Sequence, residues 1–314
     1  MMMKCLGCVL CIVAVALSVL LALSWIRHQI CLSREEELLM PLGSMVDVEG
    51  HSMSVYTEGE GSHTLVFLSG GGTCSPILDF KSLYSLLSDD YRIVVVEKFG
   101  YGFSDVVDGR RDVDTMLRQT RTALRRMNIE GPYVLCPHSM SGIEALYWAQ
   151  QYPEEVAGII GLDMVVPAYY DVMKVSVPVV KLGQYAAALG VTRWLPGIAE
   201  SDAIRGGTLT DREKEIYRAI FYRRTLTRTM ISEVQAICDS AAAVARGGVP
   251  EVPVLLFISD GTGGMGVDAA VWQHLPRTYF AGAAQAEFID LDCPHYVHNY
   301  RYREIAAAIR AFLP

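Results

Sequence analysis

The chain has few basic residues, and no tract of it gathers them together. Lys and Arg number 27 against 35 Asp and Glu, which gives a formal net charge of −8 at pH 7. A nucleic-acid-binding surface needs clustered Lys and Arg, so we expect no nucleic-acid partner. The sequence also contains no internal repeat and no low-complexity tract. Repeat architectures are thereby excluded.

The eight cysteines do not form a metal-binding or disulfide pattern. Cys5, Cys8 and Cys11 have the spacing of cluster ligands, but they lie inside an apolar run, where three thiolates would be buried in hydrocarbon. The other five are scattered along the chain. The cysteines therefore indicate no metal site, and the chemistry predicted below implies no metal and no organic cofactor.

Charge is absent from Cys5 to Ile26. At about 1.5 Å per residue, a helix over this run would be roughly 33 Å long, enough to cross a bilayer core of about 30 Å. We predict an N-terminal transmembrane anchor over residues 1–26 and a polar, acidic linker over 27–44. A cleaved signal sequence, which would make the protein secreted, is the alternative. Basic residues flank both ends of the run, so the orientation stays open.

Short apolar runs alternate with helical patterns over residues 45–314, which we predict to be one domain. We expect strands at residues 45–48, 53–56, 64–68, 92–96, from 133, 156–161, 252–258 and 286–289, and helices at 77–87, 113–127, 139–152 and 302–312. Continuous Val/Ile/Leu strands that alternate with helices indicate a mostly parallel sheet covered on both faces. Residues 167–249 break this alternation and predict helices only, at 169–189, 211–221 and 225–246. We interpret this stretch as a helical cap inserted after the sixth strand.

Ser139 lies where an apolar strand ends and a helical pattern begins. A serine on such a sharp turn has an exposed hydroxyl beside the amides of a helix N-terminus, which suits a nucleophile. The positions two before and two after, Pro137 and Ser141, are both compact, as this turn requires. An ordinary helix N-cap is the alternative interpretation.

A glycine-rich loop, Ser69-Gly70-Gly71-Gly72, follows the strand at 64–68. Acyl transfer needs two backbone N–H groups directed at the developing oxyanion. We assign one to Met140, the residue after the candidate nucleophile, and the other to Gly71. A phosphate-binding loop is excluded because neither the Walker lysine nor the G-x-G-x-x-G spacing is present.

The candidate general base is His295, in a loop after the last strand and ahead of the closing helix. His298 is expected to begin that helix or to pack against it. Two carboxylates, Asp163 and Asp260, follow strands and preserve the chain order serine, acid, histidine. The residue pattern alone leaves both open as the acid.

Three motifs carry a resemblance to the α/β-hydrolase fold superfamily, over about residues 45–314. Glu97 to Asp105 resembles that superfamily's D-x-x-G-x-G-x-S-D loop, Pro137 to Gly142 its G-H-S-M-G-G elbow, and Phe67 to Gly71 its oxyanion loop. The sequence departs from these patterns at Ser69, Glu97, Pro137 and Ser141. The resemblance implies a sheet of about eight strands with a helical cap after the sixth.

The resemblance also bears on the acid. Haloalkane dehalogenases carry a carboxylate after the sixth strand in a segment similar to 156–167, and it falls on Asp163. The more common position after the seventh strand falls on Thr262, which leaves Asp260 out of register. We therefore prefer Asp163 and keep Asp260 as the alternative. Dehalogenases and epoxide hydrolases use an aspartate where Ser139 stands, so their chemistry is not expected.

The sequence predicts a serine hydrolase that cleaves a carboxylic ester of a small-molecule acyl substrate. An amide or peptide hydrolase similar to the proline iminopeptidases is one alternative, although their G-G-S-W-G-type elbow is absent. A non-catalytic binding protein on the same fold is another. Four cap residues are expected to roof an apolar acyl pocket or to pack the cap's own core: Tyr169, Tyr170, Leu189 and Trp194.

Overall fold

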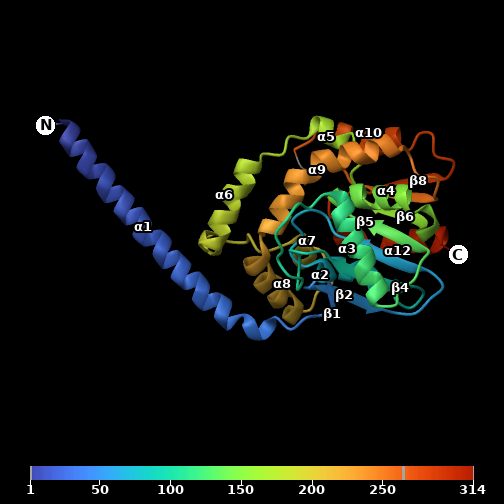
Figure 1. Ribbon diagram of the computed structural model, residues 1–314, viewed down its shortest axis with the longest axis horizontal. Coiled ribbons are helices and arrows are strands. Elements are labelled where there is room, and N and C mark those ends of the chain that lie inside the picture. Colours follow the sequence, from blue (N-terminus) through green and yellow to red (C-terminus); the bar gives the residue numbers. More distant parts are fainter. Residues whose placement is uncertain (1, 264–265, 314) are drawn as a thin grey trace.

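The computed structural model describes residues 2–263 and 266–313. Met1, the first residue of the predicted anchor, and Pro314, the last residue of the predicted domain, therefore lie outside the described residues. An eight-stranded sheet forms the centre of the fold (Figure 1). Its strands are β1 (Ser44–Val48), β2 (His51–Glu58), β3 (Thr64–Leu68), β4 (Arg92–Glu97), β5 (Tyr133–Pro137), β6 (Val156–Leu162), β7 (Val254–Ile258) and β8 (Ala286–Asp290). Their order is β1-β2-β4-β3-β5-β6-β7-β8. The pairings from β4 to β8 are parallel, and β1 and β2 are antiparallel to their neighbours.

Helices cover both faces of the sheet, and successive side chains of each strand point alternately into the two resulting cores. On one face, Val66 and Val94 belong to a core with helices α3 (Val113–Arg126), α4 (Gly142–Gln151), α9 (Arg228–Gly247) and α10 (Ala269–Tyr279). On the other, Phe67 and Val95 pack with helices α2 (Pro76–Tyr84) and α12 (Tyr302–Phe312). The helices of the sheet domain are α2 (Pro76–Tyr84), α3 (Val113–Arg126), α4 (Gly142–Gln151), α10 (Ala269–Tyr279), α11 (Val297–Tyr300) and α12 (Tyr302–Phe312), with 3₁₀ turns η2 (Ser139–Ser141) and η3 (Pro153–Glu155). The predicted α/β fold is confirmed.

A helical insertion separates β6 from β7, as the sequence predicts. It contains α5 (Tyr169–Val172), α6 (Val177–Ala188), η4 (Val191–Trp194), α7 (Asp202–Arg205), α8 (Asp211–Arg224) and α9 (Arg228–Gly247). The single helix expected over 169–189 is instead two, because Pro178 cannot continue a preceding helix and starts α6 within its first turn. The helix expected from residue 225 begins later, since the Thr227 hydroxyl accepts the Met230 N–H and caps α9.

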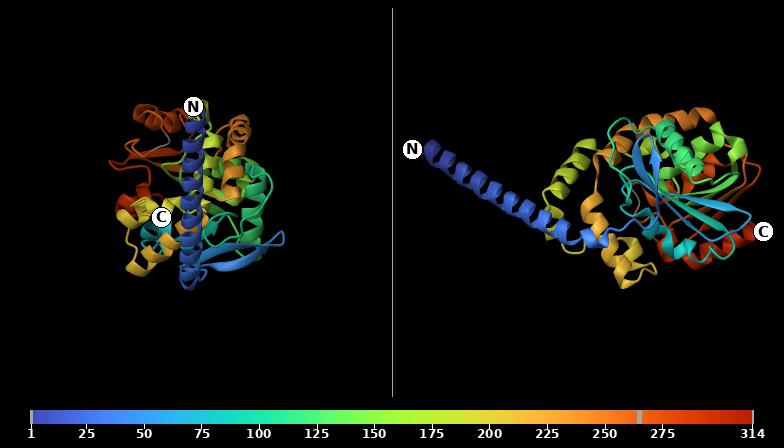
Figure 2. Two further views of the ribbon diagram at one scale, coloured as in Figure 1. Left: turned by 90° about the vertical axis from the view of Figure 1, so that its left-hand side faces the viewer. Right: turned by 60° about the horizontal axis from the view of Figure 1, so that its bottom comes forward.

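The N-terminal helix α1 (Met2–Arg34) projects from the domain as a rod (Figure 2). It is long and apolar enough to cross a membrane by length and composition. The helix continues through Arg34, well past the apolar run that ends at Ile26, and η1 (Glu36–Leu38) follows it. Much of the segment expected as a linker is thus helical.

The end of α1 packs against the cap. Arg193 donates to His28 Nδ1 at 2.8 Å and to both carboxylate oxygens of Glu35 at 2.7 Å. The Trp194 indole N–H donates to the Ser24 hydroxyl at 3.0 Å. Gly190, at φ 71°, permits this approach, since a Cβ there would lie 2.4 Å from His28 Cβ. The cap and the base of α1 therefore form one unit.

Candidate active site

Ser139 occupies the turn between β5 and α4 in a left-handed backbone conformation, with φ 53°. A non-glycine residue in this region is strained and needs its surroundings to hold it. The Val165 N–H donates to the Ser139 carbonyl at 2.9 Å, and the Ser141 hydroxyl donates to the Leu68 carbonyl at 2.6 Å. Space is tight, because a Cβ on Gly70 would lie 2.9 Å from Ser139 Cβ. The turn thus presents the serine side chain at the carboxyl edge of the sheet.

His295 and Asp163 meet at the same edge, although they are 132 residues apart. The His295 Nδ1 lies 2.6 Å from Asp163 Oδ2, and both side chains are almost fully buried. Trp272 Nε1 lies 2.9 and 3.1 Å from the two carboxylate oxygens, and the Ser259 N–H donates to Oδ1 at 2.8 Å. Asp163 itself has φ 51°. Three hydrogen-bond contacts, one from Ser259 and two from Trp272, hold the carboxylate, and the fourth is the one to the imidazole.

Asp260, the alternative acid, is not brought to His295 by any contact in the described residues. Its Oδ1 accepts the backbone N–H of Thr262 at 2.7 Å and that residue's hydroxyl at 2.6 Å. The Thr262 carbonyl in turn accepts the His295 N–H at 3.0 Å. Asp260 therefore shapes the loop against which the histidine backbone rests.

The glycine-rich loop after β3 lies against the turn that holds Ser139. Gly71, Met140 and Ser139 line one cavity, and a Cβ on Gly71 would lie 2.7 Å from Met140 Cε. The next amide, that of Gly72, points elsewhere and donates to the Tyr101 hydroxyl at 3.4 Å. The oxyanion role of Gly71 and Met140 stays a prediction.

A buried ionic network connects this loop to the cap, and the sequence did not suggest it. The Tyr101 hydroxyl donates to Glu233 Oε2 at 2.7 Å, and Lys98 Nζ donates to Glu233 Oε1 at the same distance. Glu144 lies 3.6 Å from Lys98 Nζ. Burial alone would lower the pKa of Lys98, but the two carboxylates reverse that effect and raise it. The ammonium therefore stays charged, and α9 is tied through Tyr101 to Gly72.

A second buried pair lies behind the site. His298 Nε2 lies 2.8 Å from Asp79 Oδ2, and both side chains are fully buried. The His138 ring lies 4.7 Å from the rings of both His295 and His298. Burial and those two neighbours hold the pKa of His138 well below its usual range, so this ring is neutral. His298 belongs to α11, as expected for a residue at the start of the closing helices, but the sequence did not indicate its pairing with Asp79.

A cavity of about 160 Å³ opens beside Ser139. Its lining is apolar apart from the serine and one tyrosine: Gly71, Gly72, Met140, Val165, Tyr170, Met173, Val175, Val180, Leu226, Met230, Val234 and Ile237. Of the four residues expected over this pocket, only Tyr170 lines it. Tyr169 is buried against Trp272, while Leu189 and Trp194 lie at α1, because the chain turns there at Gly190.

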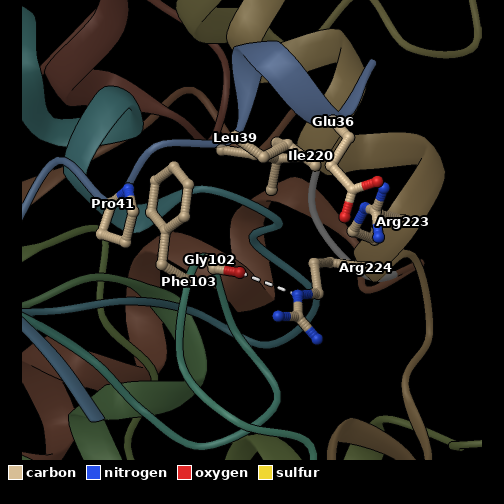
Figure 3. Close-up of a pocket in the computed structure, with 8 residues that line it drawn as sticks. All are labelled: Glu36, Leu39, Pro41, Gly102, Phe103, Ile220, Arg223 and Arg224. Atoms are coloured by element: carbon tan, nitrogen blue, oxygen red, sulfur yellow. Dashed lines mark hydrogen bonds between the residues drawn. The ribbon is translucent and has the colours of Figure 1, made fainter. Parts of the chain in front are cut away.

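Another cavity, of about 230 Å³, lies apart from Ser139 (Figure 3). It follows the seam between the chain before β1, the loop after β4 and helix α8. Arg224 crosses it and donates to the Gly102 carbonyl at 2.8 Å. None of the predicted catalytic residues lines it. Across the described residues, no group of three or more His, Cys, Asp or Glu side chains is placed to hold a metal ion.

Comparison with protein families identifies one match, to the family described as alpha/beta hydrolase fold, over residues 63–197. These residues contain the glycine-rich loop, the turn at Ser139 and Asp163. The chain is also 41% identical over 264 residues to the uncharacterized protein YbdG of Bacillus subtilis (strain 168), covering 81% of each chain.

Solved structures share the fold at low sequence identity. Cfl2 from Burkholderia cenocepacia matches with a TM-score of 0.65 and 19% identity, over 86% of this chain and 95% of that one. The enol-lactonase from Burkholderia xenovorans LB400 matches with a TM-score of 0.63 and 18% identity, over 86% of this chain and 99% of that one.

Proposed function

The chain belongs to the α/β-hydrolase fold family, and we propose that it is a serine hydrolase that cleaves a carboxylic ester. One observation carries this proposal. A buried imidazole–carboxylate pair, His295 and Asp163, lies at the sheet edge that also presents the strained Ser139 to an apolar cavity.

The geometry supports an acyl-enzyme mechanism. Asp163 accepts the Nδ1 proton of His295, which leaves Nε2 unprotonated and able to accept a proton from Ser139. The serine oxygen attacks the acyl carbonyl carbon as that proton moves to Nε2. The amides of Gly71 and Met140 stabilise the oxyanion.

The imidazolium then returns its proton to the departing alcohol as the ester C–O bond breaks. Water attacks the acyl-enzyme in the reverse sense, with His295 taking the water proton and Ser139 regaining one. The carboxylate of Asp163 holds the imidazole ring in place through Nδ1 and stabilises the imidazolium as it forms.

The cavity favours an ester over the substrate of an aminopeptidase. No charged side chain is among the residues that line it, so nothing there would pair with a substrate's α-ammonium group. An apolar acyl chain fits such a lining without a desolvation cost. The comparison with known proteins supports hydrolase chemistry at the level of the family.

We further propose that α1 is a single-pass anchor and that the enzyme is a membrane protein. Its length and hydropathy support this, and its contacts with the cap favour an uncleaved helix over a removed signal sequence.

The test is labelling of the purified protein with a fluorophosphonate probe, followed by peptide mapping. We expect covalent modification at Ser139 and none in Ser139→Ala. Failure of the native protein to react, with its fold shown intact by circular dichroism, would contradict the serine hydrolase proposal.

A further inference from the structure

Exposed apolar side chains gather on one part of the cap. Outside α1, ten large apolar side chains of the described residues are exposed, and six of them lie on α6, η4 and the turn after η4. We call these six the outer face of the cap: Val179, Leu182, Tyr185, Trp194, Leu195 and Ile198. Leu182 is 69% exposed and Val179 66%. A soluble surface rarely concentrates such side chains unless something covers them.

The charge of this segment is opposite to that of the whole chain. Residues 172–199 contain no Asp or Glu, whereas the chain carries a net charge of −8. Lys174 and Lys181 are both exposed there. An apolar face bordered by lysines is typical of a helix that lies in the interface of an anionic bilayer.

Contacts with α1 place the outer face at the depth of a membrane surface. Trp194 hydrogen-bonds to Ser24, which lies inside the uncharged run, and Arg27 lies 4.3 Å over the Trp194 ring. From Leu6 to Ser24 a helix rises about 27 Å, close to the thickness of a bilayer core. Ser24 therefore marks the edge of the hydrocarbon, where tryptophan side chains concentrate. In the right-hand view of Figure 2, α1 leaves the domain on the side of the cap.

Helix α6 also forms a wall of the cavity. Val180 lines the cavity beside Ser139, while its neighbours Val179 and Leu182 are exposed on the other side. The apolar side chains of α6 therefore lie on two faces, one toward the cavity and one toward the exterior, with Lys181 beside the outer one. Within the described residues, nothing covers the outer face.

We propose that the outer face of the cap lies in the same bilayer that α1 crosses, and that the substrate is an acyl ester of that bilayer, which enters the cavity beside α6. The substrate class rests on the proposed ester hydrolase function, whereas the membrane contact does not. A second copy of the chain is the competing occupant of this face.

Photo-crosslinking tests the membrane contact without any turnover. The full-length protein, with p-benzoylphenylalanine at position 182, is placed in phosphatidylglycerol–phosphatidylcholine vesicles and irradiated. We expect lipid adducts within about threefold of those from position 23 in α1, and at least tenfold above those from Met45, an exposed residue on edge strand β1. Adducts as scarce as at Met45, or adducts to a second protein chain in place of lipid, would overturn the proposal.

Kinetics test the entry route. L182E/Y185E and the matched control M45E are each assayed on a soluble butyrate ester and on a palmitoyl ester embedded in vesicles. We expect the double variant to lose at least tenfold on the embedded ester and less than twofold on the soluble one, with M45E unchanged on both. Equal losses on both esters, or no loss on either, would overturn entry from the bilayer. If the native protein hydrolyses neither ester, the ester hydrolase proposal fails, while crosslinking still decides the membrane contact.

Discussion

Replacing Asp163 by Asn should abolish turnover by changing which imidazole nitrogen carries the proton. The Ser259 N–H lies 2.8 Å from Oδ1 and Trp272 Nε1 lies 2.9 Å from it, so this position must stay an acceptor. The asparagine oxygen will occupy it, which turns the amide NH₂ toward His295 Nδ1. That nitrogen must then accept a proton, so Nε2 becomes the protonated one and cannot take the proton of Ser139.

The expected loss is large but the fold should survive. In serine proteases the equivalent loss of the correct tautomer lowers kcat by about 10⁴, which corresponds to about 5.4 kcal/mol in the activation barrier. Stability changes less, because asparagine keeps the acceptor for Ser259. We expect the free energy of unfolding to fall by no more than about 2 kcal/mol, the size of one charge-assisted hydrogen bond.

The assay is hydrolysis of the soluble butyrate ester, with the fluorophosphonate labelling rate as a second measure. Asp260→Asn is the matched control, and its kcat should stay within about twofold, since asparagine also accepts the Thr262 N–H. The reasoning is refuted if Asp260→Asn loses activity and Asp163→Asn keeps it.

Three further predictions follow from other parts of the structure. Burial raises the pKa of Glu97 from 4.5 to about 7, so the protonated side chain stabilises the fold fully below pH 4.5, and this contribution is lost as the pH rises through 7. The free energy of unfolding of Glu97→Gln, measured with urea, should therefore exceed that of the native protein by up to about 3 kcal/mol at pH 8 and equal it at pH 4.5. Val234→Trp narrows the cavity, and the KM for an octanoate ester should rise at least tenfold while kcat/KM for the acetate stays within about threefold. Arg193→Ala removes the largely buried ion pair with Glu35, which should raise the rate of protease cleavage between residues 35 and 43 at least tenfold. The control Arg212→Ala removes the exposed ion pair with Glu215 and should leave that rate unchanged.

The sheet and the positions of Ser139 and His295 are predictable from sequence because each depends on local features. A buried parallel strand is a continuous apolar run, and the carboxyl ends of such strands meet at one edge. Asp163 and Asp260 both follow strands, so position alone does not separate them. What separates them is backbone direction: Asp163, at φ 51°, turns its carboxylate toward the histidine, whereas Asp260 folds back on its own loop.

Contacts across the cap were beyond sequence reasoning for a different physical reason. Lys98 and Glu233 are 135 residues apart, and no local pattern states that the two charges share one buried site. Trp194 is an apolar residue in a cap, which predicts a place over the pocket or in the cap's own core. The left-handed Gly190 turns the chain so that the indole lies on α1 instead.

The continuity of α1 limits how far the catalytic domain can reach. A flexible linker lets a tethered domain sample a volume that grows with linker length, but a helix that runs unbroken to Arg34 and is held by Arg193 acts as a stiff strut. With α1 as the proposed anchor, the catalytic domain is held at one height above the bilayer and in one orientation relative to it. An ester embedded in a membrane must then reach the domain by lateral diffusion within the same bilayer, and an ester in an opposing membrane lies beyond its reach.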